Sequence, residues 1–288
     1  MKTSTRTALL ITYSIVLLAA MSASIRAAIA LALGPDTAQA SQILLGPFVT
    51  AALIYMNRRK IFHRVEWAVR GGLAVLALGI VLFVAGKTAG TSLAAGDQLS
   101  LMISALVALW LGGFLLCFGS AAFKTGLFPL LFLLICIPLP SVILDRSITI
   151  LQHGSAEMSY VLLKFSGIPV YREGVTFTFS NLIMIVAPEC SGIRSAIAIV
   201  ITCLLAGHLM LRSTWRKGLL IAVAVPLLMF KNAVRITMLS LLAVYVDPRI
   251  LTSALHREGG IPFFLLGLVL LYPVLKLPSL SQPSLTKM

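Results

Sequence analysis

The chain has 288 residues, of which 59% are hydrophobic and only 11% are charged, and its formal net charge at pH 7 is +14. Ordinary globular domains carry about a quarter charged residues, so this composition excludes a soluble protein. Because several apolar stretches approach the roughly 20 residues that cross a bilayer core, we expect an all-α polytopic membrane protein. The basic residues stand in short loops rather than on a soluble domain, so the positive charge does not indicate nucleic-acid binding.

The apolar stretches predict about eight transmembrane helices. In chain order these lie at about residues 8–33, 42–56, 67–86, 99–119, 127–144, 190–211, 218–246 and 261–277. A longer segment of mixed polarity, 145–189, separates the fifth helix from the sixth. We expect one integral membrane domain over residues 1–278, with 145–189 as an extracytoplasmic insertion, and a disordered tail at 279–288.

Two basic loops set the expected orientation in the cytoplasmic membrane. They are NRRKIFHR at 57–64 and RSTWRK at 212–217, and positively charged loops prefer the cytoplasmic side. With eight helices, both termini then lie in the cytoplasm. The insertion at 145–189 and the loop DPRILTSALHREGG at 247–260 face the extracytoplasmic side.

The insertion divides into two predicted elements. Residues 145–165 mix apolar and polar positions at near-helical spacing, which predicts an amphipathic helix along the membrane interface. Residues 168–187 contain VTFTFSN, in which apolar and polar residues alternate. This alternation predicts a short β-hairpin.

One of the four cysteines stands in an unusual place. Cys117, Cys136 and Cys203 lie inside predicted apolar helices, where buried thiols act as small hydrophobes. Cys190 instead stands at the predicted outer start of the 190–211 helix, where no second cysteine is expected. A helix N-terminus favours the thiolate form, whereas the neighbouring carboxylate of Glu189 opposes it. The residues therefore indicate either a reactive thiol or a packing cysteine at a capped helix start.

The residues that follow Cys190 are compatible with both interpretations. Ser191 and Gly192 allow close approach of the backbone, and Arg194 stands four residues after Cys190, one turn along the same helix face. As an alternative to a functional role, the Arg194 side chain extends to the interface with its stem along apolar surface.

Three polar residues interrupt the apolar stretch 225–242. Lys231, Asn232 and Arg235 lie within the predicted span, and a charged residue there costs about 2.5–3.5 kcal/mol. Arg235 stands about 17 residues after the expected cytoplasmic helix start at 218, or about 26 Å at 1.5 Å per residue, which places it in the outer leaflet. These residues indicate a functional interior or, alternatively, helix packing through polar contacts.

His256, in the loop before the last predicted helix, has nearly the same expected depth as Cys190 and Arg235. Three separate segments then bring a thiol, a guanidinium and an imidazole to one membrane face. A lone loop histidine is more often simply solvated. No histidines or cysteines show the spacing HExxH or CxxC, so we expect neither a metal ion nor another cofactor.

The ordered motifs ECSGIRS, NAVRI and HREGG, with GIPVYREGVTFTF upstream, resemble the exosortase/archaeosortase family over roughly residues 100–275. The resemblance implies a membrane cysteine transpeptidase that cleaves exported proteins at a C-terminal sorting signal. That signal consists of a short motif, Pro-Glu-Pro in the best-known class, followed by a hydrophobic helix and a basic tail. The resemblance also implies that Cys190, Arg235 and His256 form the catalytic set, and it matches Arg194 and Asn232 to further motif positions.

The resulting hypothesis is a thiol-dependent transfer reaction at the outer face of the membrane. Cys190 attacks the substrate carbonyl, His256 carries the proton and Arg235 stabilises negative charge. Arg194, Asn232, Glu189 and Ser191 support the site or bind the substrate. The expected partners are exported proteins with a sorting signal, membrane lipids and a lipid or glycan acceptor. Two alternatives stay open: a cysteine protease that only hydrolyses, and a transporter or scaffold whose polar residues line a path.

Overall fold

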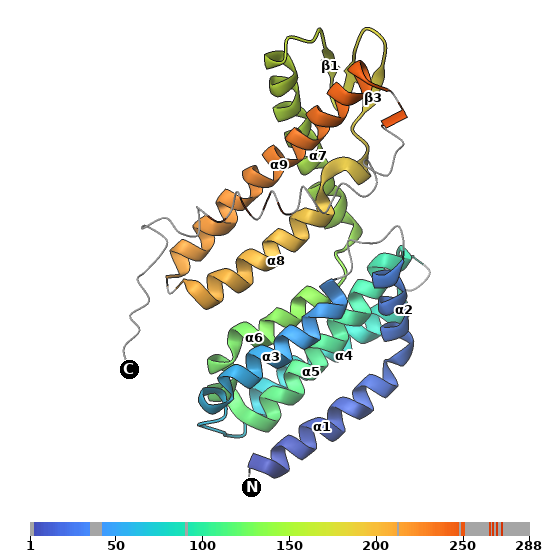
Figure 1. The fold of residues 1–288 in the computed structure, drawn as a ribbon. Coiled ribbons are helices and arrows are strands. Elements are labelled where there is room, and N and C mark those ends of the chain that lie inside the picture. The colour runs from blue at the N-terminus through green and yellow to red at the C-terminus, as the bar shows by residue number, and fades with distance from the viewer. Residues whose placement is uncertain are drawn as a thin grey trace, which may run out of the picture. The chain divides into compact units, whose positions relative to one another are not determined.

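The computed structural model describes residues 3–34, 42–89, 92–211, 213–247 and 249–250, together with the single positions 265, 267, 269 and 272. The chain divides into two compact units, Met1–Leu144 and Asp145–Met288 (Figure 1). The single membrane domain expected over residues 1–278 stays a prediction, and the tail at 279–288 lies outside the described residues.

The regular elements in the described part of the first unit are all helices. Its elements are α1 (Thr3–Ala20), α2 (Ser22–Leu33), α3 (Gln42–Ile61), α4 (Val69–Thr88), α5 (Ala95–Thr125), α6 (Leu127–Leu131), the 3-10 helix η1 (Phe132–Cys136) and the start of α7 (Ser141–Phe165). Glycines let α4 and α5 pack closely: a Cβ at Gly79 would lie 2.7 Å from Cγ of Leu109. Small residues at helix contacts are typical of membrane proteins.

Phenylalanine rings pack together within the otherwise aliphatic core of this unit. The rings of Phe114 and Phe118 are fully buried and lie 5.0 Å apart, and Phe62 lies 4.8 Å from Phe118. α5 is kinked at Gly119, which has a φ of 87°. The backbone of Glu66 fits against this kink, because its N–H donates a hydrogen bond of 3.3 Å to the Phe118 carbonyl.

Two predicted helices are broken in the structure. The stretch 8–33 bends by 74° between α1 and α2, and the stretch 127–144 bends by 88° between η1 and α7. The second break follows from Pro138 and Pro140, because proline lacks an N–H donor and disfavours helical geometry in the residue before it. α7 begins directly after Pro140, where the Ser141 N–H and hydroxyl donate to Asp97 over 2.6 and 2.7 Å.

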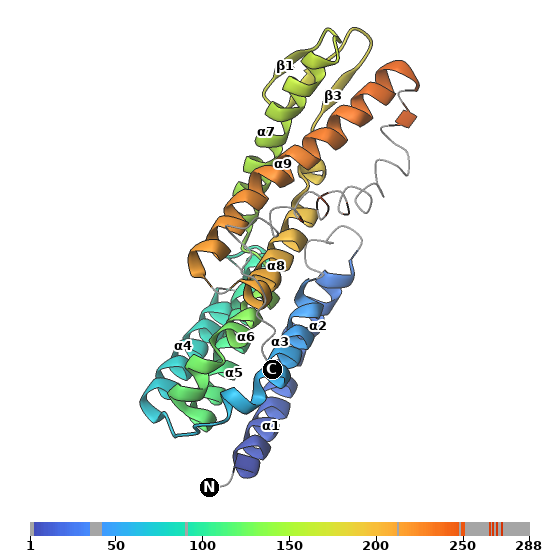
Figure 2. The ribbon, with the colours of Figure 1, turned by 60° about the vertical axis from the view of Figure 1, so that its left-hand side comes forward.

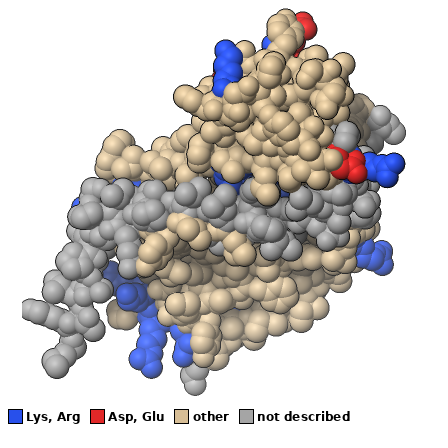
Figure 3. Space-filling model, turned by 45° about the horizontal axis from the view of Figure 1, so that its top comes forward, with Lys and Arg blue, Asp and Glu red and all other residues tan. Residues whose placement is uncertain are grey.

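Four helical segments of the described residues are long and apolar enough to cross a membrane: Val69–Thr88, Ala95–Thr125, Pro188–Met210 and Thr214–Tyr245. Counting each bent pair as one span raises this number to six, below the expected eight. The expected span at 42–56 is helical but is not among the candidates, and the span at 261–277 lies mostly outside the described residues. Most of the described residues visible in Figure 3 are uncharged, in agreement with the low charge content of the chain.

The second unit packs a small sheet against helices. After α7 follow β1 (Tyr171–Glu173), β2 (Thr176–Thr178), β3 (Ile183–Ile185), the 3-10 helix η2 (Pro188–Ser191), α8 (Ile193–Met210) and α9 (Thr214–Tyr245) (Figure 2). The sheet is antiparallel with strand order β1-β2-β3, so the expected hairpin is extended by a third strand. In the centre of this sheet, Phe177 is fully buried.

One face of the amphipathic helix α7 packs inside this unit. A Cβ at Gly154 of α7 would lie 2.6 Å from Sδ of Met229 in α9, so the two helices approach closely. The Ser159 hydroxyl donates to the Ala233 carbonyl of α9 over 3.3 Å. Gln152 Nε2 donates to the Val186 carbonyl, which fixes the end of β3 to α7.

Candidate active site

A tight turn presents Cys190 ahead of α8. Cys190 lies in η2, and Gly192 follows with a φ of 81°, a conformation that favours glycine. A Cβ at Gly192 would lie 3.2 Å from Cγ and Oδ1 of Asn232. α8 therefore begins at Ile193, three residues later than the expected start at Cys190. We name Pro188–Gly192 the cysteine turn.

Two consecutive residues of α9 hold the cysteine turn. Asn232 Nδ2 donates to the Cys190 carbonyl over 2.8 Å, and Lys231 Nζ donates to the Ser195 hydroxyl over 2.6 Å. Ser195 in turn donates to the Gly192 carbonyl over 2.9 Å. Lys231 and Asn232 are only 3% and 1% exposed, so their hydrogen bonds form away from solvent, where a lost partner is costly. The turn is thus anchored on both sides of Gly192.

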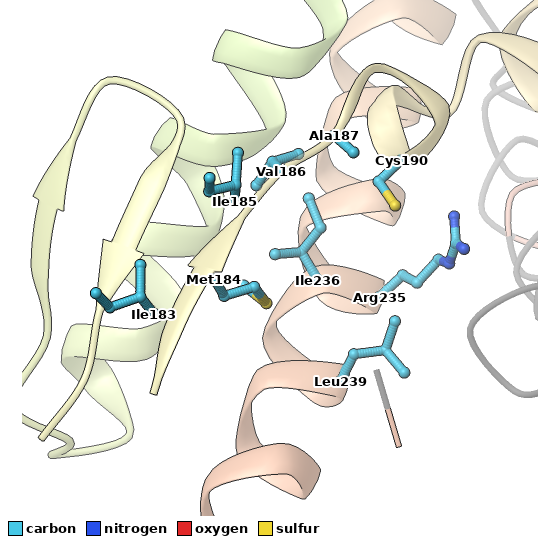
Figure 4. A pocket seen from close by; sticks show the side chains of 9 residues that line it. All are labelled: Ile183, Met184, Ile185, Val186, Ala187, Cys190, Arg235, Ile236 and Leu239. Carbon is cyan, nitrogen blue, oxygen red and sulfur yellow. The ribbon is translucent and has the colours of Figure 1, made fainter. Parts of the chain in front are cut away.

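Cys190 and Arg235 line one cavity of about 210 Å³ (Figure 4). The other lining residues come from β3, the segment after it, and α9: Ile183, Met184, Ile185, Val186, Ala187, Ile236 and Leu239. The sulfur of Cys190 and the guanidinium of Arg235 lie on the same side of this cavity in Figure 4. The Arg235 charge acts electrostatically on the Cys190 thiol.

The other predicted site residues are placed differently. Ser191 is 1% exposed, and its hydroxyl accepts a hydrogen bond from the Ile193 N–H at 3.4 Å. Glu189 and Arg194 are exposed and do not line the cavity. His256 lies outside the described residues, so its convergence with Cys190 and Arg235 stays a prediction.

Sequence reasoning missed Ser195, although it stands at the end of the motif ECSGIRS. Ser195 links Lys231 to the cysteine turn, and it does so through a hydrogen bond to a residue 36 positions later, which no local pattern reveals. The only local signal is its place one turn after a glycine at a helix start. Gly267 was missed as well: a Cβ there would lie 2.8 Å from Ile199 Cδ1 and 3.3 Å from Lys231 Cδ.

None of the four cysteines, all of which are described, forms a disulfide bond. Cys136 and Cys203 are buried and Cys117 is half-buried, which agrees with the packing role expected for these three. Among the described residues, no group of three or more histidine, cysteine, aspartate or glutamate side chains is arranged to hold a metal ion.

These features define a multi-span helical protein with a thiol and a guanidinium in one cavity. Residues 35–273 match the family described as transmembrane exosortase (Exosortase_EpsH), and the chain belongs to this family. It is therefore a multi-pass membrane protein of a family regarded as cysteine transpeptidases, and membership implies the processing of sorting signals on PEP-CTERM-type proteins. No curated protein and no solved structure matches the chain.

Proposed function

We propose that this protein is a membrane cysteine transpeptidase that cleaves C-terminal sorting signals at the outer face of the cytoplasmic membrane. The observation that carries the proposal is the cavity shared by Cys190 and Arg235. The anchored cysteine turn adds support, because catalysis requires a nucleophile held in one geometry.

In the first half-reaction, the substrate's hydrophobic helix lies beside the protein and its scissile peptide reaches Cys190. The thiolate attacks the peptide carbonyl carbon to form a tetrahedral oxyanion, which Arg235 stabilises by its fixed charge. His256 accepts the thiol proton and later delivers it to the leaving amine. The carbon–nitrogen bond breaks, and a thioester joins the substrate to Cys190.

In the second half-reaction, the hydroxyl or amine of a lipid or glycan acceptor attacks the thioester. The acceptor loses its proton to His256, and the thiol of Cys190 is regenerated. Attack by water would instead give simple hydrolysis. Mass spectrometry of the mature substrate C-terminus separates the two outcomes, because transfer adds the mass of the acceptor and hydrolysis leaves a free carboxyl group.

The nucleophile is tested by Cys190→Ala in cells that co-express an exported protein with a Pro-Glu-Pro motif, a hydrophobic helix and a basic tail. We expect no processing, because the attacking sulfur is gone, while the variant still accumulates in the membrane. Cys203→Ala is the matched control, since Cys203 is a buried thiol of α8 outside the cavity, and it should process normally. Cleavage by Cys190→Ala at the normal rate would show that the nucleophile assignment is wrong.

A further inference from the structure

β3 is an edge strand of the three-stranded sheet. Toward β2, the Val186 N–H donates to the Val175 carbonyl over 3.0 Å, and the Leu182 carbonyl accepts the Phe179 N–H at 2.8 Å. Because backbone groups alternate in direction along a strand, the N–H and C=O groups of Ile183 and Ile185 point away from β2. Among the described residues, no strand pairs with this outer edge.

The cavity at the candidate active site follows this edge. Five consecutive residues, 183–187, line one side, and Arg235, Ile236 and Leu239 of α9 line the other. The three residues of β3 span about 10 Å along the strand, and residues 186 and 187 continue from its end. Since neighbouring residues of β3 all contribute, the cavity runs along the strand, and it reaches the Cys190 thiol near the strand's C-terminal end (Figure 4).

An edge of this kind recognises an extended peptide. Unpaired backbone groups offer hydrogen bonds to an added strand, and a flanking cavity receives alternate side chains of that strand. The lining here is apolar except at Cys190 and Arg235, which stand where the reacting carbonyl is expected. We propose that β3 binds the substrate segment immediately upstream of the scissile bond as a fourth, parallel strand. This inference rests on the proposed function and names how the substrate is held.

The parallel direction follows from the chain path. β3 runs from Ile183 toward Ala187 and thus toward Cys190. In the proposed reaction, the substrate's hydrophobic helix follows the scissile bond and enters the membrane, so the upstream residues approach from the outer side. The substrate therefore also runs toward Cys190 from its N-terminal side. Three alternate substrate residues then bond to the outward groups of Ile183 and Ile185, and the middle one bonds to both.

Proline at alternate positions is compatible with this pairing. In an added edge strand only every second residue turns its N–H toward β3, and proline is tolerated where the N–H side faces away from the sheet. In a Pro-Glu-Pro segment, the glutamate backbone would bond to β3 and both prolines would face outward. A Pro-Glu-Pro segment therefore fits this edge in one of its two possible registers.

Disulfide cross-linking tests the proposal in a Cys190→Ala background, which holds the substrate uncleaved. Ile183→Cys and Ile185→Cys place thiols on β3, where the native side chains are 67% and 64% exposed. Tyr171→Cys is the matched control, because Tyr171 is 67% exposed but stands on β1 at the opposite edge. Single cysteines are scanned along the substrate upstream of its scissile bond.

We expect cross-links from positions 183 and 185 at alternate substrate residues, with the strongest partner shifting by two residues toward the scissile bond from 183 to 185. Tyr171→Cys should stay at the level of the parent variant. A shift in the opposite direction would contradict the parallel pairing. Equal cross-linking from Tyr171→Cys, or no cross-link from β3 with a substrate that co-purifies, would overturn the proposal.

A processing assay with Cys190 intact gives a second measurement. Ile185→Pro removes an N–H that does not serve β2, so processing should fall on the order of three- to tenfold, whereas Ile185→Ala keeps the N–H and should retain more of the rate. Equal rates for the two variants would contradict the pairing. Processing that depends on Cys190 without β3 cross-links overturns only the strand pairing, whereas processing independent of Cys190 overturns the proposed function.

Discussion

Two glycines that both have a positive φ serve different purposes in the two units. Gly119 has a φ of 87° and Gly192 a φ of 81°. A Cβ at Gly119 would lie 2.4 Å from the Glu66 carbonyl oxygen, which is backbone, whereas at Gly192 it would meet the side chain of Asn232 at 3.2 Å. Gly119 therefore lets the backbone of Glu66 pack directly against the backbone of α5. Gly192 shapes a turn that side chains of α9 hold in front of a cavity.

An arginine in each unit shows the same contrast between packing and a place at the cavity: Arg6 in the first unit is buried, and Arg235 in the second is half-buried. Arg6 donates to the Cys117 carbonyl over 3.0 Å and lies 4.7 Å from the centre of the Trp67 ring, so its charge is used in packing. Arg235 lines the cavity beside Cys190. The comparison indicates that changes near Gly119 should alter stability and that changes near Gly192 should alter processing.

The largest expected effect on processing, apart from loss of Cys190, comes from Arg235→Ala. Removing a fixed charge that stabilises an oxyanion should slow processing by about 10²–10³-fold. Arg235→Lys keeps the charge but not the planar guanidinium, so its cleavage rate should lie between those of the wild-type protein and Arg235→Ala. The measurement is the rate of substrate cleavage divided by the amount of inserted protein.

Arg6→Ala is the control for this prediction. It removes a nearly buried guanidinium from the first unit and should lower stability without changing the cleavage rate per inserted molecule. If Arg6→Ala and Arg235→Ala reduced that rate equally, the functional contrast between the two arginines would be lost.

The next largest effects are expected from alanine substitutions at Gly119 and Gly192. Gly119 has a φ of 87° and a ψ of 175°, a region that essentially only glycine adopts, so alanine there costs about 1–3 kcal/mol, and contact with the Glu66 backbone adds to this cost. We expect Gly119→Ala to lower the free energy of unfolding by more than about 2 kcal/mol. Gly192→Ala should lose only about 1–2 kcal/mol, because the Asn232 side chain can shift, yet its processing rate should fall.

Thermal unfolding in detergent and the cleavage assay measure the two quantities for both glycine variants. A Gly192→Ala protein that cleaves at the wild-type rate would show that the geometry of the cysteine turn does not matter for the reaction.

The smallest effect is expected from Asn232→Ala, which removes the hydrogen bond to the Cys190 carbonyl. A loss of about 0.5–1.5 kcal/mol corresponds to a two- to tenfold slower cleavage. Thr237→Val is the control, because the Thr237 hydroxyl is buried in α9 and has no hydrogen-bond partner in the described part of the chain. A similar loss in Thr237→Val would mean that any polar change in α9 disturbs the site.

Local patterns in the sequence predicted the helical membrane class and the presence of strands after residue 168. They also singled out Cys190, Asn232 and Arg235 as candidate site residues. Hydropathy did not predict the break at Pro138 and Pro140, although the two prolines were its visible signal. The number of strands was not predicted, because each of the three strands has only three residues, too few for separate alternating patterns. The anchoring of the cysteine turn depends on hydrogen bonds across about 40 positions, which become visible only when α8 and α9 pack together.

Gly267 extends this network to the last part of the chain. Its Cα fits between Ile199 and Lys231, and Lys231 is bonded through Ser195 to the carbonyl of Gly192. Even one methyl group at position 267 would press on the lysine stem, and through Ser195 the displacement would reach the cysteine turn without direct contact. A genetic screen for defective sorting should therefore recover substitutions at this glycine, and their phenotype would resemble an active-site lesion.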